Sequence, residues 1–312
     1  MLALTFYSCS NKDSEKKKVV YVNSYHRGFP PSDQITRGVT ENLSPDSIEL
    51  YAFFMDTKRN PEESYIVNRA EEIRDSILRI KPDILIVSDD NALKYLALPY
   101  FKESPFPIVF CGINWSIEQY DLRGYTVTGV LEILPIAELV EMLKPYYPEM
   151  RKLLVLNENT TTSRKTKPIL DTLLASRGMA VTQELVDNFE QWKSVFAEAN
   201  QVYDIIYLQT RGAIKGWDHD EALKLIDEQL KIPLITCEEF MMPYAVVGLT
   251  QLSEEQGRKA AEICRLILNG KTAGEIPVVR NNQSQVWLNT RLADKIRFTP
   301  DTSLVKQALT IK

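Results

Sequence analysis

Short apolar runs rich in β-branched residues alternate with longer segments of helical period. This alternation occurs twice, once in each half of the chain. The apolar runs of the first half lie at 19–23, 48–54, 83–88 and 107–112, and those of the second half at 152–157, 179–186, 203–209 and 232–237. The segments of helical period lie at 33–43, 61–80, 90–97, 162–177, 189–200 and 218–230. This alternation is typical of parallel sheets covered by helices. The sequence therefore predicts an α/β protein with two doubly wound parallel-sheet lobes in tandem.

The carboxyl-terminal quarter predicts how the two lobes are joined. A strong helical pattern covers 253–269, and the dipeptide Asn269-Gly270 is a plausible stop signal. The extended pieces 276–279 and 285–289 are needed by neither lobe, so we expect them to be hinge crossings. We expect the first lobe to comprise 19–129 and 249–277, and the second to comprise 130–248 and 278–312.

Composition limits the possible functions. A length of 312 residues suits about two domains, and a net charge of -5 argues against a nucleic-acid partner. Only 18 residues precede the first predicted strand, too few for a DNA-reading helix-turn-helix. Two histidines and four cysteines without a C-x-x-C pair predict no metal site and no cofactor. No window approaches the roughly 18 apolar residues of a membrane-spanning helix.

The amino terminus looks like the end of a bacterial lipoprotein signal peptide. It reads MLALTFYSC, and Cys9 would become the lipidated first residue. The polar segment that follows is suited to a flexible tether, so 1–18 is expected to be a signal remnant and tether. The alternative is a frayed end in which Cys9 has no role.

Polar and aromatic residues follow nearly every predicted strand. Ligands of open parallel sheets bind outside the carboxyl ends of the strands, although helix capping alone also explains polar residues there. The candidate ligand-binding residues of the first lobe are Ser24, Tyr25, His26, Ser88, Asp89, Asn91, Asn114 and Trp115. Those of the second lobe are Asn157, Asn159, Thr160, Thr161, Thr210, Arg211, Glu238 and Glu239.

Four of these candidates suggest a specific chemistry. Asp89, with its neighbour Asp90, would hold a ligand ammonium, or one of the two carboxylates caps the next helix. Arg211 would clamp a carboxylate or phosphate, or it is a solvated residue at a strand end. Trp115, like Tyr25, would stack on an aromatic ligand part, or it packs at a lobe rim.

The two loops of the first lobe are harder to interpret. The loop 24–33 is rich in aromatic, Gly and Pro residues, and its His26 titrates near neutral pH, although most surface histidines have no role. In the loop 56–61, Lys58 and Arg59 either face an anion or are solvated charges, and the solvated alternative is favoured.

Catalysis is the least favoured class of function. The pairs Asp89-Asp90 and Glu238-Glu239 would suit a glycoside hydrolase only if a carboxyl group of one pair lay roughly 5 to 10 Å from a carboxyl group of the other. No G-x-S-x-G, P-loop or H-E-x-x-H string is present. Cys111 and Cys237 end strands and are expected to be small buried residues rather than nucleophiles.

Three stretches resemble a known family. The segments KPDILIVSDDNAL, TGVLEILPIAELVEMLKPYYPEMRKLLVLNENT and VVGLTQLSEEQGRKAAEICRLILNGKTAGEIPV are similar to ABC transporter substrate-binding proteins of the tryptophan-binding type. YVNSYHRGFPPSDQITRG and FFMDTKRNP resemble the subset found as extracytoplasmic sensor regions of bacterial histidine kinases.

The resemblance implies a fold and a function. The implied fold is that of type I periplasmic binding proteins, with two lobes joined by three crossings and closing on a small molecule. In the family, the turns that match 88–91, 157–161 and 210–212 face the ligand. The implied protein is monomeric, lies outside the cytoplasm and touches the membrane only through a lipid anchor. Its partner is an ABC permease or, alternatively, a membrane sensor kinase. Asp89, Arg211 and the aromatic loop favour an amino acid or related zwitterion as the ligand.

Overall fold

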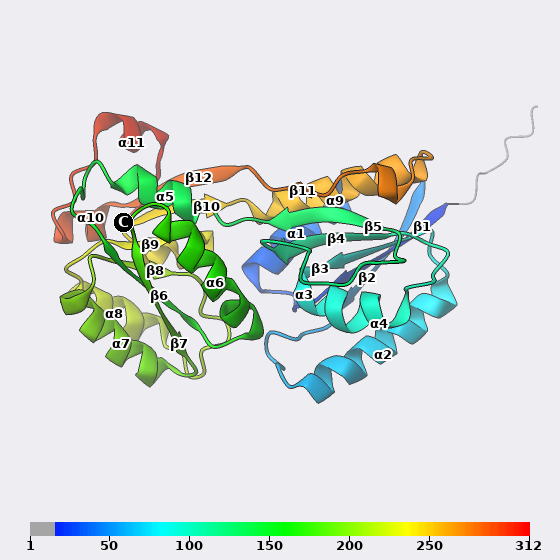
Figure 1. Cartoon of the computed structure of the whole chain (residues 1–312), viewed down its shortest axis with the longest axis horizontal. Helices are drawn as coiled ribbons and strands as arrows, with labels where there is room; N and C mark the ends of the chain where they lie inside the picture. The colour runs from blue at the N-terminus through cyan, green and yellow to red at the C-terminus, as the bar shows by residue number, and fades with distance from the viewer. Residues whose placement is uncertain (1–15) are drawn as a thin grey trace, which may run out of the picture.

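The computed structural model describes residues 16–312, apart from the side chain of Thr161. It contains two α/β lobes side by side, with the chain crossing between them along one edge (Figure 1). Cys9 and most of the expected tether lie outside the described residues. None of the helices described in 16–312 has both the length and the apolar character that crossing a bilayer requires.

The first lobe is built on a six-stranded sheet of order β11-β5-β4-β3-β1-β2, in which all the strands pair in parallel. Its strands are β1 (Lys17–Asn23), β2 (Ile48–Phe54), β3 (Ile84–Ser88), β4 (Ile108–Asn114), β5 (Val127–Glu132) and β11 (Val279–Arg280). Its helices are α1 (Pro30–Glu41), α2 (Glu63–Ile80), α9 (Ser253–Leu268), the short turn η3 (Ala273–Glu275), and a composite of α3 (Asp89–Asn91), the π-helix η1 (Ala92–Ala97) and α4 (Leu98–Tyr100).

The second lobe is built on a seven-stranded sheet of order β13-β12-β10-β9-β8-β6-β7. Its strands are β6 (Lys152–Glu158), β7 (Ala180–Val186), β8 (Ile205–Leu208), β9 (Leu234–Thr236), β10 (Val247–Gln251), β12 (Ser284–Asn289) and β13 (Leu309–Ile311). Its helices are α5 (Ile136–Leu143), α6 (Thr161–Ala175), α7 (Phe189–Val202), α8 (His219–Gln229), η2 (Glu239–Tyr244), α10 (Thr290–Lys295) and α11 (Thr302–Gln307). Only the pairing of β10 with β12 is antiparallel among the described strands.

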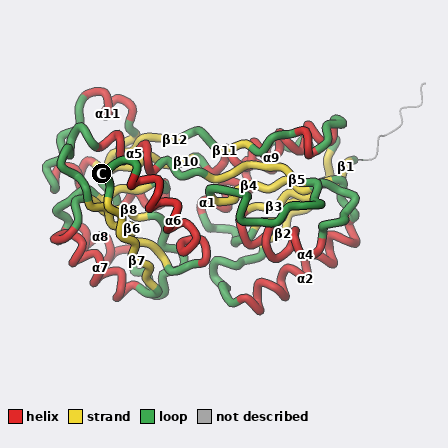
Figure 2. Tube along the Cα trace, viewed as in Figure 1, coloured by secondary structure: helices red, strands yellow, loops and turns green. Residues whose placement is uncertain are grey.

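The local sequence explains these elements. The strand β3 is buried along its whole length, as expected for a strand covered on both faces. The helix α2 buries Ile66, Ala70, Ile73 and Ile77, whose spacing of three and four places them on one face. The helix α6 begins at its N-cap Thr160, whose hydroxyl accepts a hydrogen bond from the Ser163 amide. Figure 2 shows helices on both faces of each sheet.

Three crossings join the lobes, and the structure therefore confirms the predicted α/β architecture. They run from β5 to α5, from β10 to α9 and from β11 to β12. The sheets assign β5 and β11 to the first lobe and β10 to the second. The expected lobe boundaries at 129/130 and 248/249 thus fall within β5 and β10, and the boundary at 277/278 falls just before β11. The third crossing lies at 281–283, between the two extended pieces expected to form it.

Side chains of the crossings tie them to one another. Asn281 accepts a hydrogen bond from the Ile133 amide at 2.8 Å and donates one to the Ile133 carbonyl at 3.2 Å. Glu255, at the start of α9, accepts hydrogen bonds from the amides of Asn282 and Gln283 at 3.0 and 2.8 Å. The three crossings therefore form one hydrogen-bonded hinge.

Candidate functional site

A cleft lies between the carboxyl ends of the strands of both lobes. Its centre encloses about 60 Å³. The sequence-predicted residues that line it are Tyr25, Asp89, Asn114, Thr160, Thr210 and Glu238. The lining residues that sequence reasoning did not select include Phe29, Lys58, Glu132, Glu158, Thr162, Ser163 and Gln209. We call this space the central chamber.

Backbone strain is concentrated at this cleft. Asp56, Asp89 and Trp115 have φ values of 58°, 68° and 65°, and each lies within two residues of the end of β2, β3 or β4. A left-handed conformation is costly for a residue with a side chain, and such residues gather at ligand-binding sites. The strain therefore supports a binding role for this end of the first sheet.

Lys58 and Glu158 connect the two lobes directly. The Lys58 ammonium lies 2.5 Å from Glu158 Oε1, and the two side chains are only 11% and 1% exposed. Glu158 also accepts a hydrogen bond from the Ala213 amide at 2.7 Å. Burial alone raises the pKa of Glu158, but the Lys58 ammonium, together with hydrogen bonds from the Ala213 amide and Thr210, outweighs burial and holds that pKa below its usual value. The expectation that Lys58 is a solvated loop charge was wrong, because its partner lies 100 positions away in the other lobe.

Other contacts across the cleft show that the lobes lie closed. The ring centroids of Phe29 and Phe240 are 5.8 Å apart, and Gln34 donates a hydrogen bond to Glu239 at 3.3 Å. The Lys165 ammonium lies 5.2 Å from the ring centroid of Tyr120.

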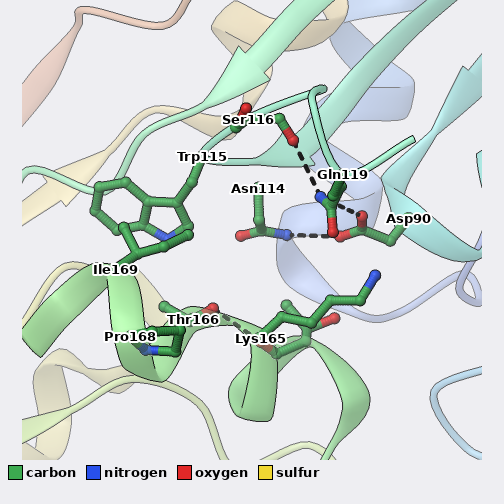
Figure 3. Close-up of a pocket in the computed structure, with 10 residues that line it drawn as sticks. Asp90, Asn114, Trp115, Ser116, Gln119, Lys165, Thr166, Pro168 and Ile169 are labelled. Atoms are coloured by element: carbon green, nitrogen blue, oxygen red, sulfur yellow. Dashed lines mark hydrogen bonds between the residues drawn. The ribbon is translucent and has the colours of Figure 1, made fainter. Parts of the chain in front are cut away.

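A larger pocket adjoins the central chamber and shares Asn114 and Thr162 with it. It has a volume of about 400 Å³. Figure 3 shows the indole of Trp115 beside Ile169, with Pro168 also on the α6 side of the pocket. Asp90 lies at the other end, where it accepts hydrogen bonds from Tyr120, Asn114 and Gln119. One end of the pocket is thus apolar and the other end is polar.

Three of the four carboxyls that line the central chamber carry raised pKa values, whereas that of Glu158 is lowered. Burial, and then the neighbouring Glu132, raise the pKa of Asp89. Burial raises the pKa of Glu132 to about 6, against the opposing effect of a hydrogen bond from Gln251. Burial, and then Glu132, raise the pKa of Glu238.

We expect the free energy of unfolding to fall as the pH rises from about 4.5 to about 6. Over this range the folded protein retains the Glu132 proton that the unfolded chain, with a pKa of 4.5, has released. Folding therefore takes up a proton, and its stabilising effect is lost as the pH passes the folded pKa. The loss due to Glu132 is about 2 kcal/mol. Urea unfolding at several pH values measures it, and Glu132→Gln should flatten the profile; an equally steep profile would exclude Glu132 as its source.

Four of the remaining sequence-predicted residues make hydrogen bonds that support the walls of the cleft, and a fifth, Thr161, is placed only by its backbone. Ser24 donates to the Ser88 carbonyl and accepts from the Ala92 amide, and the Ser88 hydroxyl donates to Asp89. Asn91 donates to Thr57. Asn157 lies beneath the chamber, where it donates to Ser163 and Gln209. Thr161 is the first residue of α6.

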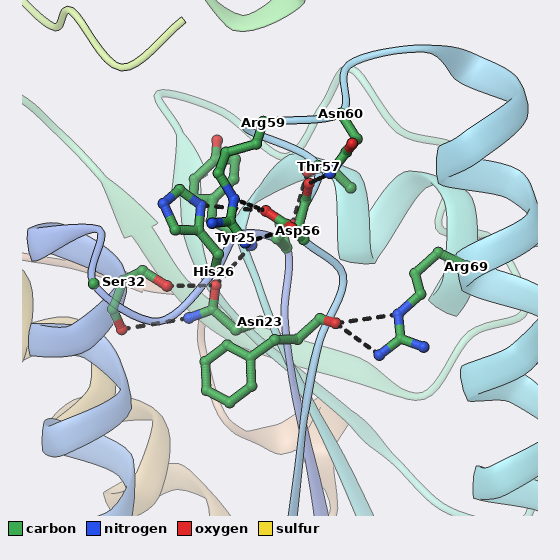
Figure 4. Close-up of polar contacts among 12 residues, drawn as sticks. Asn23, Tyr25, His26, Ser32, Asp56, Thr57, Arg59, Asn60 and Arg69 are labelled. Atoms are coloured by element: carbon green, nitrogen blue, oxygen red, sulfur yellow. Dashed lines mark hydrogen bonds and ion pairs between the residues drawn. The ribbon is translucent and has the colours of Figure 1, made fainter.

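The other sequence-predicted residues lie away from the central chamber. His26 faces Asp56 at 3.4 Å, beside Arg59 (Figure 4), and burial followed by Arg59 lowers its pKa. Arg211 lies over the rings of Trp217 and Tyr244, at 5.6 and 5.7 Å from their centroids. Asn159 pairs with Asp187, and Glu239 lines a second opening that adjoins the chamber at Pro31 and Glu238.

Two of the lining residues that the sequence analysis did not select stand in segments that could have indicated them. Glu158 opens the polar segment 158–163 that follows a predicted strand, and Glu132 lies in one of the stretches that carry the family resemblance. Cys111 and Cys237 are fully buried, as expected of small core residues.

The two lobes, the three crossings and the cleft define a type I periplasmic-binding-protein-like fold. The sequence model of the ABC transporter substrate binding protein family matches residues 32–312. The chain therefore belongs to the ABC transporter substrate-binding proteins. Proteins of this family bind small-molecule ligands and work with ABC permeases.

Individual relatives are distant. A protein named as tyrosine-binding from Clostridioides difficile is 21% identical over 216 residues, which are 65% of this chain and 62% of that protein's length. An ABC domain crystallised with L-Trp from Streptococcus pneumonia has a TM-score of 0.74 at 16% identity, covering 96% of this chain and all of that one. A ligand-free, open substrate-binding protein from Clostridium difficile has a TM-score of 0.66 at 17% identity, covering 95% and 99%. These structures are similar to this chain in fold.

Proposed function

We propose that this protein is an extracytoplasmic solute-binding lipoprotein, anchored through Cys9, that captures an amino acid or related zwitterion between its lobes for an ABC permease. The observation that carries the proposal is that the cleft offers both carboxyl acceptors and hydrogen-bond donors to a ligand. Carboxyls line the chamber from both lobes, whereas the first turn of α6 offers backbone amide donors and the positive end of a helix dipole beside them. The ammonium of a zwitterion is complementary to the carboxyls, and its carboxylate is complementary to the donors.

The adjoining pocket suits the body of such a ligand. Its volume of about 400 Å³ lies within the range of small-molecule sites, and Trp115 and Ile169 offer apolar surface. Two similar proteins are described as binding tyrosine or as holding L-Trp. Aromatic amino acids are therefore the first ligands to test.

A ligand would act by stabilising the closed arrangement. Residues of both lobes line the chamber, so a molecule held there makes more contacts when the lobes are closed than when they are open. The observed cleft thus supports binding and release through hinge motion rather than catalysis.

Thermal-shift screening against amino acids, nucleosides and sugars tests the proposal. We expect amino acids, aromatic ones above all, to raise the melting temperature by several degrees at concentrations about 100 times the Kd, because they bind only the folded state. Stabilisation by sugars alone would contradict the zwitterion.

The alternative role is a sensor module that signals to a membrane histidine kinase. The loops 24–33 and 56–61, which resemble sensor regions, are held together by Thr57, which donates to the Ser24 carbonyl at 2.7 Å. Genes for a permease and an ATPase beside this one favour transport, and a kinase gene favours sensing.

A further inference from the structure

The central chamber holds more negative than positive groups. Asp89, Glu132, Glu158 and Glu238 line it, and Lys58 is the one cationic side chain among the described residues that line it. The Lys58 ammonium is already paired with Glu158 at 2.5 Å. Three carboxyls therefore remain without a cation.

The remaining carboxyls have few hydrogen-bond donors from the protein. Gln251, at the second crossing, donates through the same nitrogen to Glu132 Oε1 and to Glu238 Oε1, the latter at 3.2 Å. Ser88 donates to Asp89 Oδ2 at 3.1 Å. No residue in 16–312 donates a hydrogen bond to Asp89 Oδ1 or Glu238 Oε2, and neither oxygen is among the fully enclosed side-chain atoms, so both are open to the chamber that their residues line. These open acceptors and the excess of carboxyls suit the chamber to a ligand group that brings both hydrogen-bond donors and positive charge.

We propose that the central chamber is the subsite for a protonated amine of the ligand, held jointly by Asp89 and Glu132 of the first lobe and Glu238 of the second. The inference rests on the proposed function and specifies which end of the ligand the chamber takes. A primary ammonium brings three donors and one positive charge. The chamber's 60 Å³ is about the volume of two water molecules, which admits this head group and leaves the rest of the ligand to the adjoining pocket.

This subsite gives the amine the leading role in closure. Glu132 ends β5 and Glu238 follows β9, so an ammonium between them is held from both lobes only when the lobes are closed. Without a cation, closure brings Glu132 of the first lobe toward Glu238 of the second lobe, where both share the Gln251 nitrogen, and the repulsion between the two carboxylates opposes closure. The amine therefore favours the closed state both by its contacts and by removing this repulsion.

Calorimetric titration of the full chain with matched ligands tests the inference. The probes are L-tryptophan, tryptamine, which lacks the carboxylate, and indole-3-propionate, which lacks the amine. We expect tryptophan and tryptamine to bind and indole-3-propionate to bind at least about tenfold more weakly, because it leaves the carboxyls without donors. Indole-3-propionate that binds as tightly as tryptophan would overturn the amine subsite.

Two isosteric variants test whether Glu132 and Glu238 hold the ligand amine. We expect Glu132→Gln and Glu238→Gln each to weaken tryptamine binding at least about tenfold, because each removes a charged acceptor. Glu228→Gln removes the same charge from an exposed position on α8 and should change the affinity less than about twofold. Melting temperatures of all three variants establish that they are folded. Unchanged tryptamine affinity in both cleft variants would overturn the inference.

The same measurements separate the inference from the proposed function. If tryptophan binds but is insensitive to Glu132→Gln and Glu238→Gln, the amine subsite is wrong and the proposed function stands. If only sugars or nucleosides bind, both are wrong. A thermal shift with calcium or magnesium alone that both variants abolish would instead identify the chamber as a metal site.

The pH dependence gives an independent readout. The groups that face the chamber are Asp89, Glu132, Glu238, Glu158, Lys58 and Tyr25. An ammonium requires ionised carboxylates, and Glu132 has a pKa of about 6. Tryptamine affinity should therefore rise from pH 5 to pH 7.5, and this rise should be smaller in Glu132→Gln.

Discussion

Replacing Gly257 with alanine is expected to lower the free energy of unfolding by about 3 kcal/mol. Gly257 lies on α9 where that helix crosses α1, and a Cβ atom there would lie 2.0 Å from the Ile35 carbonyl oxygen and 2.8 Å from the Val39 amide nitrogen. Both neighbours are backbone atoms, so the helices must move apart. Gly38 lies on α1 at the same contact between the two helices, where a Cβ atom would lie 2.2 Å from the Glu254 carbonyl oxygen.

Separating α1 from α9 should also disturb the cleft. The helix α1 follows the loop that brings Tyr25 and Phe29 into the central chamber, and α9 begins directly after the second crossing. Urea unfolding with linear extrapolation measures the effect. Gly274→Ala is the matched control, because a Cβ atom there meets nothing within 4 Å. A Gly257→Ala variant as stable as Gly274→Ala would show that the helix crossing tolerates a methyl group.

Much of the fold could be predicted because buried parallel strands leave a strong sequence pattern. The predicted run 48–54 coincides with β2, and the predicted run 152–157 lacks only the last residue of β6. The strands β5 and β10 were missed, since VTGVLE and VGLTQ are short and each contains a glycine. The structure explains the first of these glycines: a Cβ atom at Gly129 would lie 2.1 Å from the Phe110 carbonyl oxygen.

The site was predictable only where it follows from strand ends. Asp89, Asn114 and Glu238 lie at the carboxyl ends of strands that the pattern identified, and all three line the chamber. Glu132 was missed together with its strand. Lys58 was misjudged because the sequence of a loop does not indicate which side chain of the opposite lobe it will meet.

Lys58→Met is expected to shift the lobes from the closed to the open arrangement. Methionine is similar in length to lysine but cannot neutralise Glu158, whose side chain is 1% exposed in the closed state. Breaking a buried ion pair by removing one partner costs about 3–5 kcal/mol, and opening the cleft hydrates the carboxylate and avoids this cost. Small-angle scattering should show a larger radius of gyration for Lys58→Met than for the unaltered protein.

Two further variants identify the cause of opening. In the double variant Lys58→Met, Glu158→Gln, the buried charge is gone, so the scattering profile should return toward the closed form, because a neutral amide still accepts the Ala213 amide proton. Arg59→Met removes the neighbouring cation, which is 61% exposed and paired with Asp56 in the same lobe, and should leave the profile unchanged. If Lys58→Met stayed closed, the ion pair would not be what holds the lobes together. If the double variant stayed as open as the single one, Lys58 would favour closure through its other contacts, with the Phe29 ring and beside Gly212, rather than through its ion pair with Glu158.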